Sequence, residues 1–176
     1  MSLTESNRDS NPELIDIIID SEKKSLLELL VSEEIKGKID IKLNNNDLTV
    51  ITNILKYSPE FLNDIEKAII EIIKDNRIDS NDIPNFIIII QKLYELIYNS
   101  KKVKYDSKKI ADVCGNILKF IIHIMVEERK IKIEDDKKMI FLELTDKLID
   151  SCINLLILPK LLKGTSCLRK LICIKN

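Results

Sequence analysis

The chain of 176 residues is poor in several residue types that particular functions require. It has only 3 glycines, and neither GxGxxG nor GxxxxGK[ST] occurs, which excludes the glycine-rich loops that hold nucleotide phosphates. Its four cysteines, Cys114, Cys152, Cys167 and Cys173, form no CxxC pair, and His123 is its single histidine. Structural zinc sites need four such ligands at characteristic spacings. We therefore expect neither a cofactor nor a metal site.

Long uncharged segments are missing as well. The longest of them, residues 83–91 and 151–159, are far shorter than the roughly 20 apolar residues of a membrane-spanning helix. The acidic, polar start also lacks the basic and then apolar pattern of a signal peptide. We expect no transmembrane segment and an intracellular, reducing location. There Cys114 and Cys152 would be free thiols on apolar helix faces, while Cys167 and Cys173 could pair or be modified.

Isoleucine and leucine dominate the apolar residues, which form 45% of the chain, enough for one domain with a real core. They recur at helical spacing, and charges interrupt them every three or four residues, which favours helices over strands. The short spacing between helix starts predicts an all-α, up-and-down antiparallel helical bundle with an N-terminal helical extension. The expected helices cover about residues 14–31, 47–56, 59–73, 83–98, 107–128 and 135–158.

Four segments follow from this pattern. Residues 1–11 are expected to be disordered, 12–57 to form the N-terminal helical segment, 58–160 to form the bundle core, and 161–176 to form a basic, cysteine-containing tail. The helix with the run FIIII is apolar nearly all round, so we expect it to be central. The last helix should end at Pro159. Its expected core face carries Phe141, Leu144, Leu148, Cys152, Leu155 and Leu156.

The acidic segment KDNRIDSNDIPNFI, residues 74–87, resembles a calcium loop at first sight. An EF-hand register that puts Ile78 at position 8 and Asp82 at position 12 places Ile73 at position 3, where an oxygen ligand is needed. The segment is better interpreted as a helix start, because IDSNDI resembles LNNNDL at residues 43–48 and YDSKKI at residues 105–110. Each has two apolar residues five apart, the spacing of a hydrophobic staple. The expected helix caps are Asn44, Ser58, Asp79 and Asp106.

Charge is distributed unevenly although the net charge is only −1. Acids outnumber bases up to residue 35, and no acid follows Asp150. The basic tail could contact an acidic partner, phosphate or nucleic acid, or it could be a solvated end that binds nothing specific. The residues that would make such a contact are Lys160, Lys163, Arg169, Lys170 and Lys175.

No group of residues in the sequence satisfies the requirements of an enzyme active site. His123 lies between two isoleucines and has no cysteine or aspartate at a catalytic spacing, so we expect it to be structural. Tyr94 and Tyr98, one helical turn apart, fit the edge of the core better than a partner surface. We therefore expect a protein without enzymatic activity that acts through other proteins as an oligomer or in a larger assembly.

The segments IIKDNRIDSNDIPNFIIIIQKLYELI and LIDSCINLLIL, with the basic tail, resemble small helical proteins of large nucleocytoplasmic DNA viruses over residues 60–173. The resemblance implies a minor capsid or internal virion component, located in the virion or the host cytoplasm, and it supplies no catalytic residues. Two alternatives stay open. One is a Bcl-2-like groove that captures a partner helix, although no NWGR-like segment occurs. The other is nucleic-acid contact through the basic tail.

Overall fold

The computed structural model describes residues 17–19, 26–31, 43–75, 77–99 and 106–162. Within these ranges the chain forms six α-helices, one 3-10 turn and one pair of short strands, which confirms the all-α helical bundle. The elements in chain order are β1 (Ile17–Ile19), α1 (Leu26–Val31), α3 (Asn45–Tyr57), α4 (Glu60–Ile73), the 3-10 turn η1 (Ser80–Asp82), α5 (Ile83–Asn99), α6 (Ser107–Glu127), β2 (Ile131–Ile133) and α7 (Asp135–Leu162).

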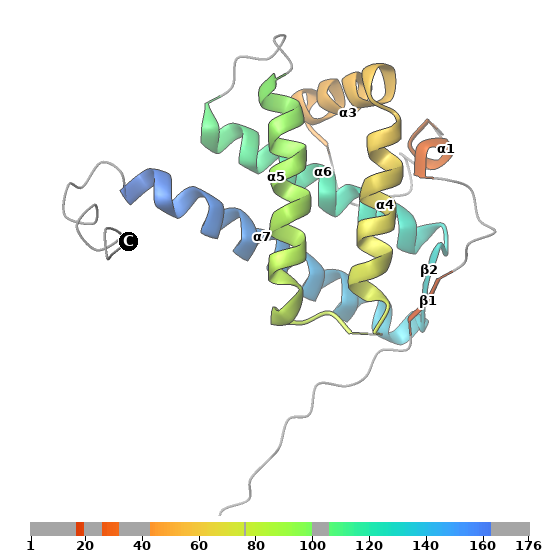
Figure 1. The fold of residues 1–176 in the computed structure, drawn as a ribbon. Helices are drawn as coiled ribbons and strands as arrows, with labels where there is room; N and C mark the ends of the chain where they lie inside the picture. Colours follow the sequence, from red (N-terminus) through yellow and green to blue (C-terminus); the bar gives the residue numbers. More distant parts are fainter. Residues whose placement is uncertain (1–16, 20–25, 32–42, 76, 100–105, 163–176) are drawn as a thin grey trace, which may run out of the picture.

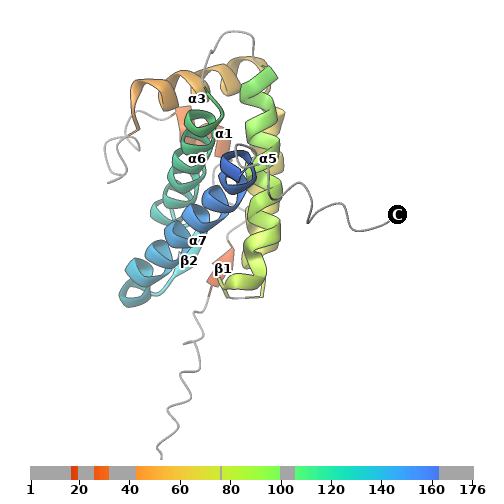
Figure 2. The ribbon, with the colours of Figure 1, turned by 90° about the vertical axis from the view of Figure 1, so that its left-hand side faces the viewer.

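Two antiparallel helix pairs make the body of the bundle (Figure 1). Helices α4 and α5 run side by side in opposite directions, and α6 and α7 form a second pair that crosses behind them. Helix α3 lies across one end of the body (Figure 2). The second half of α7 extends past α5, so part of this helix projects from the body.

Helix α6 is the central element, and our expectation that the FIIII helix would be central was wrong. The side chains of α6 are buried on most sides of the helix, because α1, α3, α5 and α7 all pack against it. In α5, by contrast, Ile88 is 50% exposed although it lies within the FIIII run. The buried α6 side chains are Ile110, Ala111, Val113, Cys114, Ile117, Leu118, Phe120, Ile121, Ile122, Ile124, Met125 and Val126.

The N-terminal segment contributes to the same core. Leu26, Leu29 and Leu30 of α1 are buried against the bundle. Ile17–Ile19, which we expected to be helical, forms strand β1 and pairs antiparallel with β2, so that Ile17 faces Ile133. Three consecutive β-branched residues have low helix propensity, and the strand formed by IKI offers them a partner that the local sequence does not show. The disorder expected for residues 1–11 lies outside the described residues.

A buried ion pair fixes α1 and β2 to the bundle. The Lys130 ammonium, 4% exposed, lies 2.5 Å from a carboxylate oxygen of Glu66 in α4. The other Glu66 oxygen accepts a hydrogen bond of 2.9 Å from the Leu26 backbone N–H at the start of α1. One carboxylate of α4 therefore contacts the start of α1 and Lys130, the residue that directly precedes β2.

Helix α7 differs from its expected form at its end and in its buried face. It continues past Pro159 to Leu162, because proline removes only one donor of the ladder and the helix closes within the next turn. Phe141 and Cys152 are fully buried as expected, but Leu144 is 43% exposed and Leu155 is 47% exposed. Thr145, Ile149 and Ile153 are buried in their place. The buried arc of α7 is thus rotated away from the arc that leucine spacing predicted.

Candidate protein interaction surface

Three of the four expected capping residues cap helices in the structure. The Asn44 side chain accepts hydrogen bonds from the backbone N–H groups of Asn46 and Asp47, at 2.8 and 3.1 Å. Asp79 accepts from Asn81 N–H at 2.7 Å, and Asp106 accepts from Lys109 N–H at 2.8 Å. These bonds satisfy donors that a helix start otherwise leaves unpaired.

Two of these starts are capping boxes. The carboxylate of Asp47 accepts from Asn44 N–H at 3.0 Å, and that of Asp82 accepts from Asp79 N–H at 2.9 Å. Pro84 has no N–H to donate to the carbonyl of Ser80, and a 3-10 turn resolves this conflict, because Ile83 N–H donates to that carbonyl instead. The acidic segment is therefore a helix start built around a proline.

Ser58 does not have the role that we expected. It is the C-cap residue of α3, where its backbone N–H donates to the Ile54 carbonyl at 2.9 Å, and Pro59 takes the N-cap position of α4 without a side-chain cap. Only Ser58 and Pro59 separate the last residue of α3, Tyr57, from the first residue of α4, Glu60. The Ser58 carbonyl accepts from Phe61 N–H at 3.0 Å, so the backbone supplies the cap that the sequence assigned to the hydroxyl.

Ile73, at the position where a calcium loop needs an oxygen ligand, is 1% exposed and lies in the core. In the described part of the chain, no three His, Cys, Asp or Glu side chains gather closely enough to hold a metal ion. Of the five basic residues expected to contact a partner, Lys163, Arg169, Lys170 and Lys175 lie outside the described residues, and Lys160 lies in the last turn of α7.

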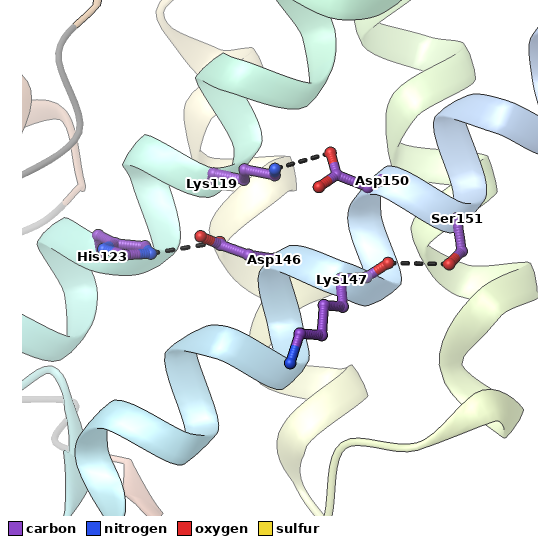
Figure 3. Close-up of polar contacts among 6 residues, drawn as sticks. All are labelled: Lys119, His123, Asp146, Lys147, Asp150 and Ser151. Carbon is purple, nitrogen blue, oxygen red and sulfur yellow. Dashed lines mark hydrogen bonds and ion pairs between the residues drawn. The ribbon is translucent and has the colours of Figure 1, made fainter.

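A polar seam that sequence reasoning missed joins α6 to α7 (Figure 3). The Lys119 ammonium lies 2.7 Å from a carboxylate oxygen of Asp150, and His123 Nε2 lies 3.2 Å from a carboxylate oxygen of Asp146. Lys119 and His123 are four residues apart on α6, and Asp146 and Asp150 are four residues apart on α7. Each pair therefore lies on one face of its helix. The sequence signal for this seam was the same i, i+4 spacing of two basic side chains on one helix and two acidic side chains on the other. The Ser151 hydroxyl donates to the Lys147 carbonyl at 2.8 Å.

The opposite side of α7 presents an exposed apolar surface. Four side chains define it, and we call it the α7 stripe: Ile140, Leu144, Leu148 and Leu155. Their spacing places them within about 80° of one another at about 100° per residue. Ile140 is 50% exposed, Leu144 and Leu155 nearly as much, and Leu148 is half-buried. The stripe spans about 22 Å of the helix.

The stripe has a hollow beside it and an ion pair along it. The hollow has a volume of about 230 Å³ and lies between α7 and the η1 turn; it is lined by Ile78, Asp79, Ser80, Leu144, Lys147, Leu148 and Ser151. The ion pair joins Lys147 to Glu143 at 3.5 Å, and both side chains are mainly exposed. Figure 3 shows Lys147 pointing away from the seam with α6. Charge and apolar area therefore occur together on the free side of α7.

A second hollow lies between α4 and α5. Its volume is about 150 Å³, and apolar side chains of both helices line it, among them Phe61, Ala68 and Ile88. Asp64 and Glu71 of α4 and Lys92 of α5 also line it. At the far end of α5, Tyr94 and Tyr98 stack with their ring centroids 6.1 Å apart, with Tyr94 half-buried at the core edge and Tyr98 exposed.

No protein-family model, curated protein or solved structure matches the chain. Among the helices in the described ranges, none has both the length and the apolar content that crossing a bilayer requires. In the ranges that the structure describes, the fold is a helical bundle with an exposed apolar face on α7.

Proposed function

We infer that the chain is a non-enzymatic structural or interaction protein that binds other protein surfaces through the α7 stripe. The observation that supports this is the exposure of Ile140, Leu144 and Leu155 along one face of α7. Phe141, Ile149 and Cys152 on another face of the same helix are buried in the core. Exposed leucine and isoleucine scattered singly are ordinary, but a row of them on one helix is typical of a protein contact. Burying such a side chain contributes about 1.5–3 kcal/mol.

The setting that we propose for this contact is the virion of a large nucleocytoplasmic DNA virus, with the chain as a minor capsid or internal component. Support comes from the sequence resemblance and from the kind of surface. A bundle of this size that carries one apolar helix face can serve as a connecting piece between larger proteins. The proposed activity is therefore binding, and it needs no cofactor.

The test is the copy number of the chain in purified particles, measured by quantitative mass spectrometry against the major capsid protein. We expect a fixed ratio for the wild type and a loss of incorporation for Leu144→Lys. Met139→Lys is the matched control, because Met139 is 70% exposed on the same helix but lies off the stripe. A chain that occurs only as a free monomer in the soluble fraction of infected cells contradicts the proposal.

A second candidate is helix capture by a groove, which the hollow between α4 and α5 favours. Its apolar lining suits the apolar face of an amphipathic helix, and Asp64 and Glu71 on the α4 side suit basic residues on that helix, while Lys92 lies on the α5 side. Fluorescence anisotropy with synthetic amphipathic basic peptides tests this candidate. Binding should be lost in Ala68→Phe, which fills the hollow, and kept in Met139→Lys. Peptide affinities that are equal in the wild type and Ala68→Phe exclude the groove.

A further inference from the structure

The Glu143–Lys147 pair carries information about what covers the α7 stripe. The two side chains are 64% and 74% exposed and lie one helical turn apart beside the apolar row. An exposed i, i+4 pair of this kind contributes only a few tenths of a kcal/mol within its own helix. Both groups can therefore exchange their partner at little cost when an oppositely charged surface arrives.

The order of these two charges along the helix favours an antiparallel arrangement with an identical helix. In a two-fold symmetric contact, if residue i of one copy meets residue j of the other, then residue j of the first copy meets residue i of the second. An antiparallel pair of α7 helices then brings Glu143 of each copy toward Lys147 of the other. In a parallel two-fold pair, residues that flank the apolar row on one side lie on opposite edges of the contact, so Glu143 and Lys147 would not meet their counterparts on the other copy.

The apolar side chains fit the same register. When residue 143 of one helix lies opposite residue 147 of the other, the two-fold axis passes near residue 145. An axis at nearly the same place brings Leu144 of one copy opposite Leu148 of the other, and Ile140 opposite Ser151. Ser151 is small, and it lines the hollow beside the stripe together with Leu144 and Leu148. An isoleucine from the other copy therefore enters a space of about 230 Å³ instead of meeting a large side chain. Charge, shape and the spacing of Ile140, Leu144 and Leu148 agree on one symmetric arrangement, in which Leu155 lies beyond the paired apolar residues.

We propose that the α7 stripe is covered by a second copy of this chain, with the two α7 helices antiparallel and Leu144 of each against Leu148 of the other. This inference rests on the proposed function and specifies its partner. A single stripe of about 22 Å buries less area than a standard stable interface. We therefore expect a weak dimer that forms in the micromolar range or above, in which each body remains free to bind a further protein.

The experiment is sedimentation equilibrium of the full chain over a wide range of concentrations. We expect a monomer–dimer equilibrium in the wild type and in Met139→Lys, and at least a tenfold loss of affinity in Leu144→Lys. Glu143→Lys and Lys147→Glu should each weaken the dimer, and the variant that combines both should recover it, because the combined exchange restores opposite charges across the antiparallel contact. Helical circular dichroism equal to the wild type shows that each variant is folded.

Three results would overturn the inference: a monomer at every concentration, a dimer that Leu144→Lys leaves intact, or a dimer that neither single charge reversal weakens. The last result points to a different orientation or surface. A monomeric chain that is still incorporated into particles refutes the dimer while leaving the proposed function in place. A dimer that obeys the charge exchange but is missing from particles supports the inference and contradicts the proposed function.

Discussion

Lys130 and Glu66 form an ion pair of 2.5 Å in which the side chains are only 4% and 15% exposed. Desolvation of such a pair offsets much of its attraction, so the pair by itself adds little net stability. Removing one partner has a much larger effect, because the other charge stays buried. The location of the pair between α4, the start of α1 and the start of β2 makes it the point at which the N-terminal elements are held.

Glu66→Gln should lower the free energy of unfolding by about 3 kcal/mol, since it removes the carboxylate beside a buried ammonium. The control is Glu71→Gln, which breaks an exposed pair with Lys74 and should change stability by less than about 0.5 kcal/mol. Urea denaturation of both variants measures the difference. Equal effects in the two variants would show that the Lys130 ammonium reaches water after the change.

The stability of the protein should depend on pH through Asp47. This carboxyl is fully buried, one of its oxygens, Oδ1, has no hydrogen-bond partner, and burial raises its pKa above the ordinary value. A raised folded-state pKa means that the folded protein binds the proton more tightly than the unfolded chain. The contribution of Asp47 is therefore fully present below the unfolded pKa near 4 and is lost as pH rises through the folded pKa.

Asp47→Asn removes this titration and leaves an amide oxygen that accepts from Asn44 and Asn116. Urea denaturation between about pH 4 and pH 7 should show the variant gaining stability relative to the wild type as pH rises. Burial also raises the pKa of Asp82, so a residual dependence of the same sign should remain in the variant. Parallel curves for the two proteins would contradict the assignment to Asp47.

Arg129→Gly should stabilise the protein by about 1 kcal/mol. Arg129 follows the C-terminus of α6 with φ of 57°, a left-handed conformation that costs a non-glycine residue about 1–2 kcal/mol and that glycine adopts freely. Glu128→Gly is the control. Glu128 has an ordinary φ of −83°, so glycine relieves no strain there and only increases the conformational entropy of the unfolded chain, and the protein should lose stability. Thermal denaturation distinguishes the opposite signs.

The thiols of Cys114 and Cys152 should not react in the native protein. Both are buried, and burial raises the pKa of Cys114 to about 12 and that of Cys152 to about 11, so the reactive thiolate is scarce at neutral pH. Iodoacetamide followed by peptide mass spectrometry should label neither site until guanidinium unfolds the chain. Native labelling of Cys152 alone would reveal local opening of α7 from α5, where its Sγ lies 3.7 Å from the Ile83 carbonyl.

Asp79→Ala should cost about 1 kcal/mol, because it removes the cap of the η1 turn and one half of a capping box. Asn81→Ala is the control at an exposed neighbouring position and should have a smaller effect. Calcium should leave the melting temperature of the wild type and of both variants unchanged. A melting temperature that rises with calcium would refute our interpretation of the acidic segment as a helix start.

Features set by neighbouring residues could be predicted from the sequence, and features set by distant contacts could not. Asn44, Asp79 and Asp106 were predictable because a cap involves only the next three residues. The seam pairs join residues 31 and 23 positions apart, so they depend on how α6 and α7 align. Strand β1 was missed for the same reason, since its partner β2 lies far along the sequence, at Ile131–Ile133.

The apolar periodicity of a helix also cannot tell which part of a wide apolar arc will be buried. In α7 the leucines at 144 and 155 lie outside the contact with α5 and α6, while Thr145 is buried because its hydroxyl bonds to the Phe141 carbonyl. Gly115 of α6 allows a close approach here, since an added Cβ would lie 3.1 Å from Ile153 Cγ1. The rotation of α7 follows from such contacts, and the exposed stripe follows from the rotation.

The pairing of β1 with β2 also affects the order in which the protein can be made. Residues 20–130 lie between the two strands, so β1 leaves the ribosome long before its partner has been synthesised. At 5–20 residues per second, the delay is on the order of ten seconds. During that time three adjacent isoleucines have an unpaired edge, which is the kind of segment that associates with other chains. Closure of the strand pair is therefore a late event in biogenesis, and chaperone binding to the nascent chain should concentrate at this edge.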